Sequence, residues 1–192
     1  MAICKKCGAP ISESDLFCSK CGEKVVLGAS IEEVKYVLNT SKKEGLLKQV
    51  LCYLVFYEDE MIFAYLSKER QNLEYKKHTQ ELKNSGAKLL GIIAGNLQFF
   101  ENYGTKYYQM SKENILKEES KNFSVKYSQI KKVKFVRPRM IYYTDDQMKE
   151  DSGDLIITLP NEKMKFTHQS YDKEAIIKMI LKKNCGGKFK YI

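Results

Sequence analysis

The middle and C-terminal parts of the chain consist of short segments in which apolar or aromatic residues alternate with polar ones. Residues 50–57 and 61–66 are rich in aromatic and branched side chains and flank the acidic triplet 58–60, so they predict a β-hairpin. Further strands are predicted at residues 114–117, 123–127, 132–136, 140–144, 155–159 and 164–167. This pattern indicates a mostly antiparallel β domain.

The hydrophobic period changes near the C-terminus, where residues 170–183 have the spacing of an amphipathic helix. Acidic residues come early in this segment and lysines come late, as the helix dipole favours. The apolar residues of one face are Ile176, Ile177, Ile180 and Leu181. We therefore expect a C-terminal helix to cover the sheet, which makes the predicted fold class α+β.

About residues 67–108 separate the predicted strands and contain two helical segments of different character. Residues 68–83 are mostly charged and have one modest apolar face, so His78 is interpreted as a helix residue rather than a metal ligand. Residues 87–100 are apolar on nearly every side, which is typical of a buried helix. We expect residues 87–100 to belong to the core, and a homo-oligomer or membrane-surface contact is the alternative.

The domain organisation follows from these patterns. Residues 27–44 combine a weak apolar helix pattern with a polar end, so they predict a linker with a short helix. The expected units are a small module at 1–26, this linker, the β domain at 45–184 with its helical insertion, and a basic tail at 185–192.

The small module contains the pattern Cys-x-x-Cys-Gly twice, through Cys4, Cys7, Cys18 and Cys21. Two residues between paired cysteines let both sulfur atoms point at one ion, and the following glycine takes a left-handed conformation that lets amide groups approach sulfur. The intervening residues 9–17 suffice for a short hairpin that brings the two pairs together. The spacing favours one structural Zn²⁺; a rubredoxin-type iron site, a redox dithiol and disulfides are the alternatives. Because sulfur fills all four positions, we expect no catalysis at this ion.

The doubled motif, with Phe17 beside Cys18, resembles a zinc ribbon over about residues 1–26. The resemblance implies a metal site whose role is to fold a segment too small to hold itself together.

A looser resemblance covers about residues 45–184. Two hairpin-linked sheets closed by one C-terminal helix resemble the bacterial pleckstrin-homology-like domains, and the sequence NFSVKYSQIKKV at residues 122–133 looks like the strand and turn of those domains. This resemblance implies an antiparallel split barrel or sandwich. A minimal domain of this type lacks the helical insertion.

Basic residues are concentrated in one part of the chain, whose formal net charge is +9 at pH 7. Residues 121–144 contain seven basic residues and no acidic residue, whereas five acidic residues follow at 145–154. The candidate phosphate-binding residues are Lys132, Lys134, Arg137 and Arg139. Tyr127, Phe135, Tyr142 and Tyr143 lie among these charges, as stacking residues for single strands would. The alternative is a solvated surface that the acidic residues neutralise.

Composition sets broad limits on the class of protein. A hydrophobic content of 43% is enough to form a core. No signal-peptide pattern opens the sequence and no apolar run approaches about 20 residues, so we expect a cytoplasmic protein. Cys52 and Cys185 are far apart in sequence and are interpreted as free thiols without a functional role.

The sequence contains none of the common catalytic motifs. His168 follows a predicted strand and precedes the last helix, so a surface or capping role is expected for it. We therefore expect a binding or adaptor protein rather than an enzyme, with a protein partner as the first expectation. The alternatives are a nucleic-acid-binding protein that uses the ribbon and residues 121–139, and a peripheral membrane protein that binds anionic lipid through the same charges.

Overall fold

The computed structural model describes two compact units, Met1–Glu32 and Glu33–Ile192. The described residues are 2–3, 7–11, 20–21, 33–44, 48–86, 88, 91, 99–100, 102–144, 147–169 and 174–192; for residues 2, 3, 11, 48, 140–144 and 147–150 the description covers the backbone alone. In the first unit, β1 (Ala2–Ile3) and β2 (Pro10–Ile11) form an antiparallel hairpin. The second unit contains a large sheet with helices, so it is an α+β domain.

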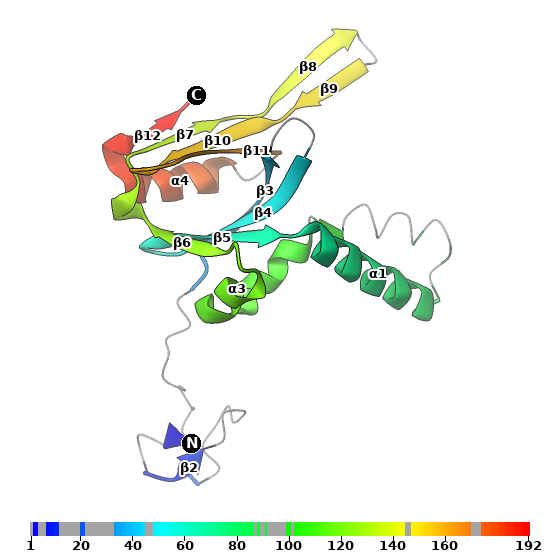
Figure 1. Cartoon of the computed structure of the whole chain (residues 1–192), viewed down its shortest axis with the longest axis vertical. Helices are drawn as coiled ribbons and strands as arrows, with labels where there is room; N and C mark the ends of the chain where they lie inside the picture. Colours follow the sequence, from blue (N-terminus) through cyan, green and yellow to red (C-terminus); the bar gives the residue numbers. More distant parts are fainter. Residues whose placement is uncertain are drawn as a thin grey trace. The chain divides into compact units, whose positions relative to one another are not determined.

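The large sheet has eight strands in the order β12-β7-β10-β11-β3-β4-β5-β6 (Figure 1). Their bounds are β3 (Tyr36–Glu44), β4 (Lys48–Phe56), β5 (Glu60–Leu66), β6 (Phe123–Lys126), β7 (Lys132–Val136), β10 (Gly153–Thr158), β11 (Lys163–His168) and β12 (Phe189–Tyr191). All neighbours are antiparallel except β12 and β7, which are parallel. The sheet is therefore mixed, and it is open because β12 and β6 form its two edges.

The sheet is built from two antiparallel groups that meet at a narrow junction. Strands β3 to β6 form one group, and β7, β10 and β11 form the other. Between β11 and β3 the register contains only Phe166 opposite Lys42 and Thr167 opposite Ser41. The expected pair of hairpin-linked sheets is thus one continuous sheet with a short junction.

Within the described residues of the second unit, two strands lie outside this sheet. Strands β8 (Arg139–Thr144) and β9 (Gln147–Asp151) pair with each other, and Figure 1 shows this hairpin projecting beyond β7 and β10. The hairpin leaves the sheet through Arg137 and Pro138 and returns through Ser152.

Helices cover parts of both faces. They are α1 (Lys68–Asn84), α3 (Lys112–Glu118) and α4 (Glu174–Cys185), with short 3-10 turns η1 (Gly104–Gln109), η2 (Tyr127–Gln129) and η3 (Gly186–Lys188). Helix α4 contributes Ile177 and Leu181 to a core that also contains Phe135 and Phe166. On the opposite face of β4 and β5, a second core surrounds Tyr53 and Ile62 and includes residues of η1 and α3.

Several predicted elements are confirmed by this arrangement. The hairpin at residues 50–57 and 61–66 corresponds to β4 and β5, and the helices at 68–83 and 170–183 correspond to α1 and α4. Helix α1 has no buried residue and extends away from the sheet (Figure 1). The predicted helix at 87–100 lies outside the described residues except at 88, 91, 99 and 100; Phe99 and Phe100 are half-buried against the second core.

Three predictions were wrong. Residues 36–44 form the long strand β3 rather than the end of a helical linker, and the side chains of residues 36–41 alternate between buried and half-buried positions. Residues 114–117 belong to α3, where the Ser111 hydroxyl accepts a hydrogen bond from the Asn114 amide and caps the helix. The basic tail at 185–192 forms η3 and the edge strand β12, because the parallel pairing with β7 supplies its hydrogen-bond partners.

Candidate functional site

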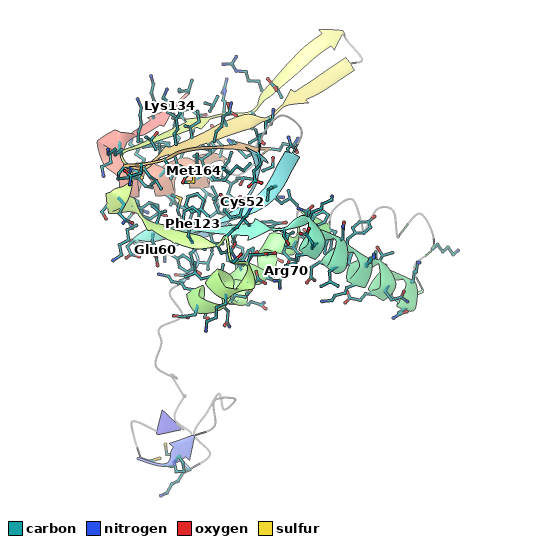
Figure 2. All side chains as sticks on the ribbon, in the orientation of Figure 1. Cys52, Glu60, Arg70, Phe123, Lys134 and Met164 are labelled. Atoms are coloured by element: carbon teal, nitrogen blue, oxygen red, sulfur yellow. The ribbon has the colours of Figure 1, made fainter. Side chains whose placement is uncertain are left out.

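The predicted basic segment forms strand β7, and its side chains alternate between the two faces of the sheet. Val133 and Phe135 are fully buried in the core beneath α4. Lys132 and Lys134 therefore point to the opposite face, and Figure 2 shows Lys134 on the side of the sheet away from α4. Two of the candidate phosphate-binding residues thus share one face of the sheet.

Neighbouring strands add three further lysines to this face. Lys134 lies between Lys190 of β12 and Ile156 of β10, and Ile156 in turn lies opposite Lys165 of β11. Lys132 lies opposite Thr158, whose other neighbour is Lys163. We call the resulting set the lysine face, which consists of Lys132, Lys134, Lys163, Lys165 and Lys190.

Among the described residues, one carboxylate pairs with a lysine of the lysine face. Asp154 of β10 contacts Lys165, with 2.8 Å between the carboxylate oxygen and the ammonium nitrogen. Within the described part of the chain, the other four lysines form no ion pair. Neighbouring strands are about 4.8 Å apart, so these positive charges are held close together by the sheet. An anion placed over the face is attracted by several ammonium groups at once.

The two predicted arginines lie outside this set. Arg137 follows the end of β7 and its amide donates a hydrogen bond to the Ile192 carbonyl, while Arg139 begins the projecting hairpin. Both are exposed, but they lie at the end of the lysine face nearest the hairpin rather than within its rows.

The predicted stacking aromatics are not on this face. Tyr127 and Phe135 are 3% and 0% exposed, so both are core residues. The side chains of Tyr142 and Tyr143 lie outside the described residues. The outward positions of β12, β7, β10 and β11 carry lysine, threonine, aspartate, valine and isoleucine, and none carries an aromatic ring.

Lys163, Lys165 and Lys190 were not among the residues predicted from the sequence. The alternation Lys-Met-Lys-Phe at residues 163–166 is a signal for the first two, since Met164 and Phe166 are buried on the opposite face. Lys190 carries no such signal, because its position depends on the parallel pairing of β12 with β7.

Cys7 of the first cysteine pair lies in a turn. Residues 4–9 join β1 to β2, and Gly8 has a φ of 71°, the left-handed conformation expected after the second cysteine of a metal-binding knuckle. Cys7 and Cys21 are half-buried, whereas Cys4 and Cys18 lie outside the described residues. Among the described residues no group of three potential metal ligands occurs. The four sulfur donors of the sequence nevertheless suit Zn²⁺ chemically.

The two histidines have structural surroundings. His78 of α1 stacks on Phe99, with 4.6 Å between ring centroids. His168 was expected at the surface, but it is 3% exposed and stacks on Phe135. Its Nε2 lies 3.2 Å from the Val136 carbonyl oxygen, and burial lowers the pKa of its imidazole. The expected surface position of His168 was wrong because the last residue of β11 faces the core.

Comparison with known proteins identifies one family. The zinc-ribbon domain family matches residues 3–25, which supports the N-terminal zinc ribbon and implies zinc binding. No curated protein and no solved structure is significantly similar to the chain. Among the helices that the structure describes, none combines the length and the apolar character needed to cross a membrane.

Proposed function

We propose that the chain is a non-enzymatic binding protein in which a structural zinc ribbon and the sheet domain act as interaction modules. The observation that carries this proposal is the lysine face, where the sheet holds four lysines without an acidic partner among the described residues. A surface of this kind attracts an anionic macromolecule. Buried His168 and the stacked His78 offer no exposed acid-base pair, which favours binding over catalysis.

The zinc ribbon is proposed to hold one Zn²⁺ through Cys4, Cys7, Cys18 and Cys21. The left-handed Gly8 in the first turn and the match at residues 3–25 support this ligand set. Bound zinc supplies the free energy that folds this small unit. Elemental analysis is expected to find one zinc ion per chain, and finding iron or no metal would contradict the ligand set.

The two units are proposed to fold independently, because Glu33–Ile192 contains its own core. Cys18→Ser should release the metal while the thermal unfolding of the sheet domain stays unchanged. Unfolding of the whole chain in this variant would show that the units depend on each other.

The sheet domain is proposed to be of the pleckstrin-homology-like type. The order of its elements supports this assignment: an antiparallel group β3 to β6, then β7, β10 and β11, then α4 packed against the core. The α1 to α3 region and the hairpin β8–β9 are additions to that order. A fold type does not determine which partner a protein binds, so the proposed function rests on the lysine face.

The general test of anion binding compares two doubly substituted proteins of equal net charge on a heparin column. Lys132→Glu/Lys134→Glu reverses two charges of the lysine face, and Lys68→Glu/Lys76→Glu reverses two exposed charges of α1. We expect the first variant to elute at much lower salt than the second. Equal elution of the two variants would assign the lysine face to ordinary solvated surface.

A further inference from the structure

The lysines of the lysine face lie in two rows that run across the strands. One row crosses the strands through Lys190, Lys134 and Lys165, and a second row crosses them through Lys132 and Lys163. With about 4.8 Å between strands and about 6.8 Å between alternate residues of one strand, the set spans about 14 Å by 7 Å at its base. The charges therefore form a band across the strands, which suits a linear polyanion better than a single phosphate.

The projecting hairpin restricts the shape of the partner. Strands β8 and β9 continue from β7 and β10 at the end of the band nearest Val136 and Asp154. Residues 139–151 contain four acidic and two basic residues. A broad anionic plane that reached this hairpin would be repelled by its net negative charge. A linear polyanion that lies along the rows avoids the hairpin, because the rows run across the strands and the hairpin extends along them.

The chemistry of the face indicates how a nucleic acid would be contacted. Proteins that bind single strands combine basic grooves with exposed aromatic side chains on which bases stack. The outward positions of these four strands carry no aromatic ring. Lysine contacts phosphate as a point charge, and the face lacks the arginine that most often reads guanine by a bidentate contact.

We infer that the lysine face binds the sugar-phosphate backbone of a nucleic-acid duplex without reading its sequence. This inference rests on the proposed function and narrows the anionic partner to one class. Four to five phosphate contacts on B-DNA give a salt slope near about −4, because each contact contributes about −0.9 to the dependence of log K on log salt. Affinity should then fall by about two to three orders of magnitude between about 50 and 200 mM salt.

The experiment uses the full zinc-loaded chain and measures binding to a short mixed-sequence DNA duplex over a range of salt concentrations. The test variant is Lys132→Gln/Lys134→Gln, which removes two contacts without adding negative charge. The matched control is Lys68→Gln/Lys76→Gln, which removes the same charge from α1. The magnitude of the salt slope should fall by about 1.8 in the test variant and stay at the wild-type value in the control.

Two further probes distinguish the failure of this inference from the failure of the proposed function. They are the corresponding single strand and vesicles that contain phosphatidylserine. Preference for vesicles or for the single strand, with loss of that binding in the test variant, would overturn the duplex inference and leave the anion-binding face intact. Identical behaviour of the test and control variants with all three probes would overturn both. Duplex binding that is strong, independent of sequence and lost selectively in the test variant is the supporting result.

Discussion

The two halves of the eight-stranded sheet differ in what covers the face opposite α4. Strands β4 and β5 are buried on both faces, between the α4 core and the second core that includes η1 and α3. Strands β7, β10, β11 and β12 are covered by a core on one face and carry the lysine face on the other. The first half therefore forms the interior of the domain, whereas no core cluster of the described residues covers the outward face of the second half.

This difference is visible in the residue pattern. Residues 50–57 and 61–66 are apolar at almost every position, as expected for strands with two buried faces. Residues 132–135 and 163–167 alternate between lysine or threonine and apolar side chains, as expected for strands with one open face. The buried residues next to each lysine in such a strand therefore fix the position of its backbone.

The largest expected effect compares two isoleucines that face away from α4. Ile62 of β5 is fully buried in the second core, whereas Ile156 of β10 is half-exposed between Lys134 and Lys165. Ile62→Ala should lower the free energy of unfolding by about 2–5 kcal/mol because it leaves a cavity. Ile156→Ala should cost less than about 1 kcal/mol. Urea denaturation followed by circular dichroism measures both, and equal losses would mean that the two halves are covered alike.

The second prediction concerns the attachment of α3 to strand β5. The Asn122 side-chain oxygen accepts a hydrogen bond from the Tyr65 amide at 2.7 Å, and its nitrogen donates one to the Ile115 carbonyl at 2.7 Å. Asn122 therefore connects β5 to α3. Asn122→Ala should cost about 1–3 kcal/mol, because a partly buried amide and carbonyl lose their partner. Asn72→Ala on the exposed surface of α1 is the control and should be neutral; matching losses would refute the connecting role.

The third prediction concerns the pH dependence of stability that arises from His168 of β11, in the half of the sheet that carries the lysine face. Burial lowers the pKa of His168 in the folded state below its value in the unfolded chain, about 6.5. Below that pH the unfolded chain binds the proton more readily, so stability should fall as pH decreases until the folded-state pKa is reached. The slope from this residue is at most about 1.4 kcal/mol per pH unit.

Denaturation of wild type and His168→Phe at several pH values between about 5.5 and 7.5 measures this contribution. The phenyl ring retains the stacking partner Phe135 but cannot titrate. The stability difference between wild type and variant should therefore shift in favour of the variant as pH falls. A pH-independent difference would mean that His168 titrates alike in both states.

The smallest expected effect on stability belongs to the lysine face itself. Lys132→Gln/Lys134→Gln should change the free energy of unfolding by less than about 0.5 kcal/mol, because the lysines make no ion pair among the described residues and their apolar neighbours stay in place. The same denaturation experiment measures it. A loss as large as that of Ile62→Ala would mean that these lysines support the fold and are not available to a partner.

Much of the fold could be predicted because local pattern and structure agree. The hairpin β4–β5, the strands β6, β7 and β10, and the helix α4 all have the periodicity that their burial requires. The short helix α3 was predicted as a strand because a segment of four residues does not distinguish the two periods. Strand β3 pairs mainly with β4, the next strand along the chain, and it was missed because Val34, Val37 and Leu38 also fit a helical spacing. Strand β12 depends on β7, which is distant in sequence, so no local pattern reveals it.

The candidate sites differ in the same way. The cysteine motif is local, so all four proposed ligands could be read from spacing alone. The lysine face is assembled from three separate segments of the chain, and only Lys132 and Lys134 of this set lie in the basic segment 121–144. Arg137 and Arg139 belong to that run by sequence, but the chain leaves the sheet at Pro138 and carries Arg139 into the hairpin.

The most direct test of the central claim is a lysine-acetylation footprint of the full chain with and without a sulfated heparin oligosaccharide. Mass spectrometry then reports which lysines the polyanion protects. We expect protection of Lys132, Lys134, Lys163 and Lys190, with Lys68 and Lys76 of α1 acetylated equally in both samples. Protection confined to α1 or to the lysines of the N-terminal unit, with Lys132 and Lys134 unprotected, would contradict it.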